Sequence, residues 1–214
     1  MEIQVAKERT PVAASDVYAA LSQAWSSVVG GTPSRSSLLV LLAQTAFETG
    51  QWASMWNYNL GNIKHVTGDG NTYIELTCTE YDSSGNPYSS PCYFRAYNDL
   101  TSGAAAFIQF LSKSSRYSSA WAAVLDGDPH TFVQQLKADG YFTGSEASYE
   151  SQVVSYFTKF NGQLPSTVPN GMQTPTGPSI WITLLGGLAL GGAAYLAYET
   201  YALKPSPVRR RRVA

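Results

Sequence analysis

An almost continuously apolar run at residues 38–43 leads to a single glutamate, Glu48, and is followed by Gly50. A helix that is apolar nearly all round has no face suited to water, so it must be covered by other elements. We therefore expect a helix over about residues 34–49 that is buried on most sides. This pattern predicts a largely helical domain built around one central helix.

Glu48 would lie in the last turn of that helix, where the unpaired carbonyl groups and the helix dipole disfavour a second negative charge. The aromatic residues Phe47, Trp52 and Trp56 are close in sequence and can exclude water. Both effects raise the pKa of a carboxyl group, as a general acid that works near neutral pH requires. The alternative is an ordinary glutamate on the solvated side of a helix end.

The remaining helices are predicted from apolar periodicity and from capping residues. They are expected at about residues 15–30, 101–113, 116–125, 129–140 and 146–160. The expected start signals are Ser15 or Asp16, Thr32-Pro33 or Ser34, Thr101 or Ser102, and Asp128 before Pro129. Residues 1–13 are expected to form an irregular lead-in.

Residues 72–97 alternate β-forming side chains around a turn signal at 82–87, which predicts a small antiparallel lobe of two or three strands. Cys78 and Cys92 fall on opposite sides of that turn and could meet in a disulfide, which would close a short loop and indicate a non-reducing environment. Two buried or two exposed thiols are the alternative. Two cysteines with two distant histidines do not form a metal ligand set, so no metal and no organic cofactor are predicted.

Five segments, in order, carry short motifs: residues 46–52, 59–64, 79–81, 93–97 and 140–149. They resemble the A-x-E-[ST]-G-x-W, N-L-F-G-I-K, T-E-Y, K-F-R-x-Y and G-Y-A-T…Y segments of glycoside hydrolase family 73, the endo-β-N-acetylglucosaminidases and flagellar peptidoglycan hydrolases. Two segments depart from the family. Gly61-Asn62 replaces Phe-Gly and resembles the G-N-I-[KR] of phage lysozymes and lytic transglycosylases, and Phe142 replaces a small residue.

The resemblance implies a lysozyme-like α+β fold, mainly α, and assigns roles to particular residues. Glu48 would be the general acid, and Glu80 of T-E-Y would be the second carboxylate, with Glu75 as its alternative. The substrate-binding set is Trp52, Trp56, Asn59, Tyr97 and Tyr141. Aromatic faces stack on sugar rings and amides bond hydroxyl or acetamido groups. Core packing is the alternative role for each tryptophan.

Charge is distributed unevenly along the chain. Residues 1–178 carry nine Lys/Arg and fourteen Asp/Glu, a formal balance of −5, whereas residues 199–214 have a balance of +4. An acidic main domain argues against nucleic acid as its substrate, because phosphate binding needs clustered basic residues. The N-terminal residues lack the apolar core of a secretory signal, so export by that route is not expected.

The C-terminal part is predicted to be a membrane anchor. A Pro/Gly-rich linker at 162–178 precedes residues 180–198, which carry no charge and are long enough to cross a bilayer. Gly187 and Gly191 offer a small-residue face for helix self-association. Arginines 209–212 would remain inside, where they could contact anionic lipid or packaged nucleic acid. The basic residues are Arg209, Arg210, Arg211 and Arg212.

The predicted organisation is a lead-in (1–13), a lysozyme-like glycosidase domain (14–161), a linker (162–178), a transmembrane helix (179–203) and a basic tail (204–214). The predicted function is cleavage of the β-1,4 glycan of peptidoglycan by an enzyme that faces outward from a membrane. A virion protein of a membrane-containing phage and a bacterial tail-anchored autolysin are the two possible sources. A lytic transglycosylase and a catalytically silent wall-binding module are the alternative functions.

Overall fold

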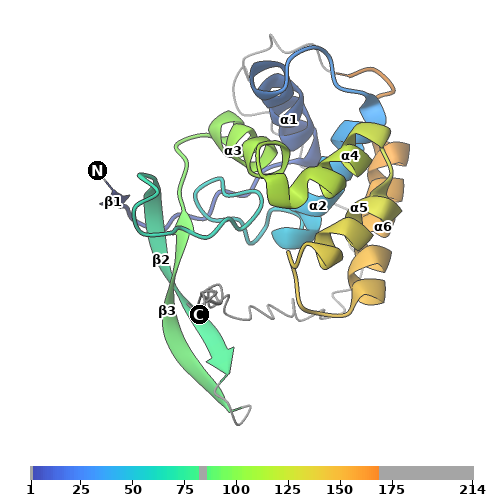
Figure 1. Ribbon diagram of the computed structural model, residues 1–214. Coiled ribbons are helices and arrows are strands. Elements are labelled where there is room, and N and C mark those ends of the chain that lie inside the picture. The colour runs from blue at the N-terminus through green and yellow to red at the C-terminus, as the bar shows by residue number, and fades with distance from the viewer. Residues whose placement is uncertain (1, 82–85, 169–214) are drawn as a thin grey trace, which may run out of the picture.

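The computed structural model describes residues 2–81 and 86–168, which form a group of helices and a small sheet (Figure 1). The helices are α1 (Ala14–Val28), α2 (Arg35–Glu48), α3 (Leu100–Ser112), the 3-10 helix η1 (Ser115–Tyr117), α4 (Ser118–Asp126), α5 (Pro129–Ala138) and α6 (Glu146–Gln163). The strands are β1 (Ile3–Gln4), β2 (Thr72–Tyr81) and β3 (Pro87–Arg95). The predicted mainly helical α+β fold is confirmed for these residues.

Helix α2 is the centre of the helical part. Every residue from Ser37 to Ala46 is buried, and the helix contacts α1, α4 and α6. The predicted cap is also present, because Oγ of Ser34 accepts a hydrogen bond from the backbone N–H of Ser37. A helix covered on all sides can hold its last residue, Glu48, in a fixed place.

The other helix starts were predicted with mixed success. Asp128 caps α5 by accepting from two backbone N–H groups, with Pro129 in the first turn as predicted. For α3 the predicted caps Thr101 and Ser102 are wrong. Asp99 is the cap, and its carboxylate accepts from the backbone and the hydroxyl of Ser102, because an ionised acceptor binds these donors more strongly than a hydroxyl does.

Helix α1 begins at Ala14, and neither Ser15 nor Asp16 caps it. The preceding residue, Ala13, has an extended backbone and makes no side-chain capping bond. Both polar residues therefore lie inside the first turn, where the acidic Asp16 still complements the positive end of the helix dipole.

The sheet has the order β1-β2-β3, with β2 and β3 forming an antiparallel hairpin. Strand β1, near the N-terminus, pairs in parallel with β2, so the expectation of an irregular lead-in is wrong at Ile3–Gln4. The hairpin extends away from the helices (Figure 1). Strand β1 is too short to show a sequence periodicity, so it could not be predicted from its own residues. Its pairing with β2 defines it as a strand.

We call residues 2–10 the N-terminal strap, because they continue from β1 along the loop that follows α2. Asn57 exchanges two hydrogen bonds with the backbone of Glu8, and the backbone of Thr10 donates to the carbonyl of Met55. The guanidinium of Arg9 lies over the ring of Trp56, 4.0 Å from its centroid. The strap thus fixes a loop that has little secondary structure of its own.

The predicted disulfide between Cys78 and Cys92 is present, with Cα atoms 5.9 Å apart. Cys78 pairs in register with Ser90, whereas Cys92 pairs with Leu76, so the two cysteines are diagonal neighbours across the hairpin. Diagonal residues on one face of an antiparallel pair lie within reach of each other. The bond therefore ties the two arms of the hairpin between its base and its turn.

No helix within residues 2–81 and 86–168 has the length and hydrophobicity needed to cross a membrane. The predicted transmembrane helix (179–203), the basic tail (204–214) and most of the predicted linker lie outside the described residues.

Candidate active site

The carboxylate of Glu48 is held by side chains from α2 and α6. Tyr149 of α6 donates a hydrogen bond to Oε1 of Glu48 (2.5 Å), and Gln44, one turn earlier in α2, donates another through Nε2 (3.1 Å). Nε2 of Gln44 also lies 2.5 Å from the Tyr149 hydroxyl. Asn62 donates to the backbone carbonyl of Glu48 (2.6 Å). The three partners converge on one residue from three separate segments of the chain.

Aromatic rings exclude water from the Tyr149 side of this network. Phe142 stacks on Tyr149 with ring centroids 3.8 Å apart, and Phe47 contacts it edge-on at 4.4 Å. Burial, followed by the nearby charge of Glu48, raises the pKa of the Tyr149 hydroxyl well above its usual value. Tyr149 therefore keeps its proton and serves Glu48 as a hydrogen-bond donor.

Burial is also the largest influence on Glu48, and it raises the pKa of this carboxyl from an ordinary 4.5 to about 7. Hydrogen bonds from Tyr149, Asn62 and Gln44 oppose the shift by stabilising the ionised form. The predicted direction is confirmed. At neutral pH both protonation states of Glu48 are populated, which is the property of a group that donates a proton.

The loop after α2 is unusually rich in left-handed backbone conformations. The non-glycine residues with positive φ are Gln51, Trp52, Asn57, Tyr58 and Asn62, with φ between 43° and 65°. Such conformations are uncommon outside glycine, and the energy they require is often tolerated at functional sites. Here they return the chain toward the end of α2, so that the side chain of Asn62 reaches the backbone of Glu48.

Two glycines let this loop pack closely against α3. A Cβ on Gly61 would lie 2.5 Å from the ring of Phe107, and one on Gly103 would lie 2.0 Å from the carbonyl oxygen of Tyr58. Neither neighbour has free space, since Phe107 is fully buried and the second contact is to backbone. Gly61, the departure from the family motif, is therefore required by the packing of this chain.

Trp52 and Asn59 support the site from within the domain. Trp52 is 2% exposed, packs against Phe160 and bonds Thr45 through Nε1, so the structure favours its core-packing role. Asn59, also 2% exposed, bonds the backbone of Ile63 with both ends of its amide and donates to the carbonyl of Arg95. Its amide is used to hold the loop to the end of β3.

Trp56, Tyr97 and Tyr141 are only partly buried. Arg9 covers one face of the Trp56 ring. Burial raises the pKa of the Tyr97 hydroxyl to about 12, against an opposing effect of Arg95. The hydroxyl of Tyr141 donates to the carbonyl of Gly61 (3.2 Å), so this residue holds the loop beside Asn62. Their predicted contacts with sugar stay predictions.

Glu80 and Glu75 lie at different distances along β2. Glu80 is buried and pairs with Tyr88, close to the hairpin turn, whereas Glu75 is exposed and pairs with Tyr93 near the base. At about 3.3 Å per residue, Glu80 lies about 20 Å along the strand from Ile74, which is buried in the small core at the base of the hairpin. The structure brings Glu48, Gln44, Tyr149 and Asn62 together, and it leaves Glu80 out on the hairpin.

Gln44 and Tyr149 were not among the predicted site residues. Tyr149 belongs to a motif of the resemblance, but its sequence position does not show which side chain it faces. Gln44 is a polar residue inside an apolar helix, four residues before Glu48 and thus on the same face. That four-residue spacing is the sequence signal by which Gln44 could have been predicted as a partner of Glu48.

Comparison with solved structures places the domain among lysozyme-like peptidoglycan hydrolase folds. The catalytic domain of the autolysin Auto from Listeria monocytogenes is 19% identical, covers 72% of this chain and 88% of its own, and has a TM-score of 0.50. A peptidoglycan hydrolase from Sphingomonas sp. A1 is 18% identical over 73% of this chain and 96% of its own, also with a TM-score of 0.50. No curated protein sequence matches the chain.

The similar structures establish the fold, and the match to a glycoside hydrolase family model establishes the class of enzyme, a glycoside hydrolase. The particular family follows from its sequence model. Residues 35–162 match the glucosaminidase family, described as mannosyl-glycoprotein endo-beta-N-acetylglucosaminidase, and the chain belongs to that family. This is the glycoside hydrolase family 73 that the five motifs resemble.

Glu48→Gln is expected to stabilise the protein at alkaline pH. The raised pKa means that the folded state binds more protons than the unfolded state between pH 4.5 and about 7, so wild-type stability falls as pH rises through this window. The free energy of unfolding of Glu48→Gln minus that of wild type should increase by up to about 3 kcal/mol from pH 4 to pH 8. Urea denaturation at both pH values measures it.

Glu146→Gln, at the exposed start of α6, is the matched control for removing a glutamate charge. Its difference from wild type should change little over the same pH range. If the Glu48→Gln difference were equally independent of pH, the raised pKa of Glu48 would be contradicted.

Proposed function

We propose that this protein cleaves the β-1,4 glycosidic bonds of bacterial peptidoglycan. One observation carries the proposal, a partly buried Glu48 with a pKa of about 7 in a domain of the glucosaminidase family. The names of the two similar structures, an autolysin and a peptidoglycan hydrolase, support cell-wall glycan as the substrate class.

In this proposal, protonated Glu48 gives its proton to the glycosidic oxygen while the bond to the anomeric carbon breaks. The leaving sugar departs as an alcohol, and Glu48 becomes a carboxylate. Tyr149 and Gln44 already donate to that carboxylate, and hydrogen bonds to an ionised acceptor are stronger than those to a neutral one. The two donors therefore favour the charge that develops on Glu48 during the reaction.

Hydrolysis needs a second group that stabilises the positive charge on the sugar or activates water, and Glu80 is the proposed group. Paired carboxylates in glycosidases lie about 5–10 Å apart, depending on the stereochemical outcome. The position of Glu80 near the hairpin turn means that the hairpin must bend toward the helices over bound glycan. Substrate-assisted hydrolysis would remove the need for that movement.

The same observation favours a second candidate, a lytic transglycosylase. In that reaction the C6 hydroxyl of the sugar attacks its own anomeric carbon, and the Glu48 carboxylate accepts the hydroxyl proton. Only one carboxyl group is needed, and the products carry 1,6-anhydro ends. The Gly61-Asn62-Ile63-Lys64 segment, which resembles that of lytic transglycosylases, agrees with this route.

Glu48→Gln should lower the rate of glycan cleavage by at least about 100-fold, because general acid catalysis contributes about 10²–10⁴-fold. The measurement is release of soluble fragments from purified peptidoglycan by the detergent-solubilised full-length protein, with mass spectrometry of the fragment ends. Glu146→Gln is the control and should remain active.

The fragment ends separate the candidates. New reducing ends would establish hydrolysis, and their identity would distinguish a glucosaminidase from a muramidase. Anhydro ends would establish the transglycosylase. A folded wild-type protein that binds peptidoglycan but releases no fragments would contradict the proposed activity.

Replacement of Glu80 tests the second group separately. If Glu80 acts in hydrolysis, Glu80→Gln should reduce kcat strongly with little change in KM, whereas Glu75→Gln, an exposed change on the same strand, should leave kcat near wild type. An unchanged kcat in Glu80→Gln would exclude it from the reaction. A loss only in Glu75→Gln would move the role to the base of the hairpin.

We also propose that residues 179–203 anchor the enzyme in a membrane. The uncharged segment 180–198 and the arginines 209–212 support a single span with the catalytic domain outside and the tail inside. The linker at 162–178 would let the domain reach the wall. A virion-associated lysin of a membrane-containing phage is the proposed setting, with the tail near anionic lipid or packaged nucleic acid.

The anchor predicts that the full-length protein stays with membranes through alkaline carbonate extraction, which removes peripheral proteins. Introducing Arg at Leu188 and at Leu190 should release it, since a charged residue at the centre of a span costs about 3 kcal/mol each on insertion scales. The same two changes at Ser151 and Ser155, on the surface of α6, are the control. Wild type in the carbonate supernatant would contradict the anchor.

A further inference from the structure

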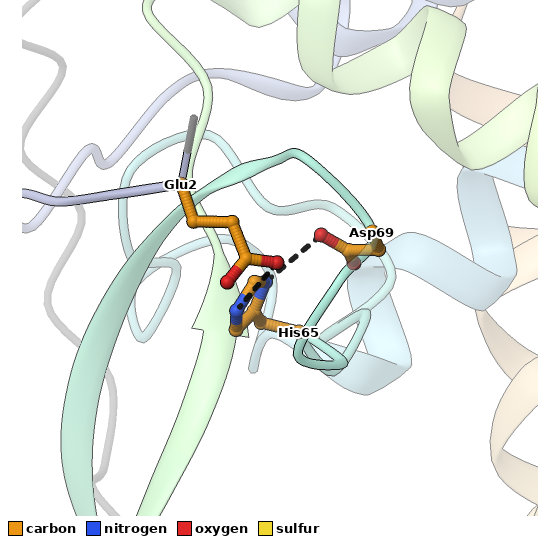
Figure 2. Close-up of side chains that lie close together, drawn as sticks. All are labelled: Glu2, His65 and Asp69. Atoms are coloured by element: carbon orange, nitrogen blue, oxygen red, sulfur yellow. Dashed lines mark ion pairs between the residues drawn. The ribbon is translucent and has the colours of Figure 1, made fainter.

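Glu2, His65 and Asp69 converge near the base of the hairpin. Figure 2 shows the imidazole ring of His65 facing the carboxyl groups of Glu2, from the N-terminal strap, and of Asp69, from the loop that leads into β2. One possible ligand atom from each of the three residues lies within 4.8 Å of the other two. The cluster is separate from Glu48 and from the residues that bond it.

His65 is fixed in this place, and each of its ring nitrogens lies near a carboxylate oxygen. The side chain is 5% exposed, its ring stacks on Tyr73 at 4.3 Å, and its backbone N–H donates to the carbonyl of Tyr93. Nδ1 is buried without a hydrogen-bond partner, although Oδ1 of Asp69 lies only 3.0 Å away. The oxygen must therefore lie off the direction in which a ring N–H would point.

The two carboxylates are also held in position. Backbone N–H groups of Gly68 and Gly70 donate to Oε1 of Glu2, which is 25% exposed and 3.8 Å from Nε2 of His65. Asp69, 14% exposed, accepts from Arg95 at Oδ2, while Oδ1 accepts from the backbone of Asn71 and faces His65. Arg95 supplies one positive charge and the two carboxylates supply two negative charges, so the cluster keeps a net negative charge when His65 is neutral.

The spacing of His65 and Asp69 suits a shared cation. In a six-coordinate site, two neighbouring ligand atoms bound at about 2.1 Å and at right angles to each other lie about 3.0 Å apart. At the tetrahedral angle of four-coordinate zinc they would lie about 3.4 Å apart. The observed separation of Nδ1 and Oδ1 is 3.0 Å. A cation between them also explains the missing hydrogen bond, because the lone pair of Nδ1 would point at the cation and to one side of the oxygen.

We propose that Glu2, His65 and Asp69 form a binding site for a divalent transition-metal ion of the Zn²⁺ type. Imidazole nitrogen favours such ions over Mg²⁺ and Ca²⁺, and two carboxylates supply the compensating charge. Glu2 completes the set by a small movement of its partly exposed side chain, and water fills the remaining positions.

The ion has a structural role in this proposal. Glu2 lies outside the residues that match the glucosaminidase family, whereas His65 and Asp69 lie within them. A bound ion would join the start of the N-terminal strap to the loop before β2, and so stabilise the segment that runs from Asn62 to the hairpin. This role is independent of the reaction at Glu48.

The test is metal binding by the full-length protein in detergent after removal of metal with a chelator. Calorimetric titration with Zn²⁺ should show one ion per chain, and Co²⁺ used as a probe should give visible absorption bands that excess Ca²⁺ does not remove. Zn²⁺ should raise the melting temperature in a concentration-dependent way. His65→Gln should abolish all three signals, and Glu2→Gln should weaken the affinity by more than about tenfold.

The chain has one other histidine, and it provides the matched control. His130 is exposed and pairs with Glu150, so His130→Gln should bind Zn²⁺ as wild type does. Circular dichroism of His65→Gln and Glu2→Gln without metal confirms that both are folded. The proposal is overturned if wild type shows no saturable binding, if folded His65→Gln binds as wild type does, or if His130→Gln loses the binding instead.

Discussion

The partial burial of one carboxyl group at the end of the central helix is the constraint on which the rest of this structure depends. A carboxylate that loses much of its contact with water is costly, so the protein must either keep Glu48 protonated or supply donors to it. It does both, because burial raises the pKa of Glu48 to about 7 while Tyr149 and Gln44 donate to its oxygen. The carboxyl group of Glu48 can therefore give up a proton near neutral pH, and the carboxylate that results is stabilised by these hydrogen bonds.

That balance depends on segments far apart in the sequence. Helix α6 supplies Tyr149, and the left-handed loop after α2 supplies Asn62. The loop is held in turn by Asn59, by the close approach of Gly103 on α3, and by the N-terminal strap. The strap therefore belongs to the catalytic domain as a structural element, although the family match begins only at residue 35.

Much of this arrangement could be predicted from the sequence, because strong local signals carry it. The apolar run before Glu48 predicted the buried helix, and the turn between Cys78 and Cys92 predicted the hairpin and its disulfide. The cause of the raised pKa was predicted only in part, since Trp52 faces the core and rings around Tyr149 exclude the water. No local sequence pattern shows which distant residue faces Glu48 or where a two-residue strand pairs. Tertiary packing decides both.

The most direct test is the pKa of Glu48 itself, measured by carbon-13 NMR of its side-chain carboxyl. We expect a midpoint of about 7 in wild type. We also expect a higher midpoint in Tyr149→Phe, because that change removes a hydrogen bond that stabilises the carboxylate. A wild-type midpoint near the ordinary value of 4.5, unchanged in Tyr149→Phe, would show that the surroundings of Glu48 do not prepare it to act as an acid.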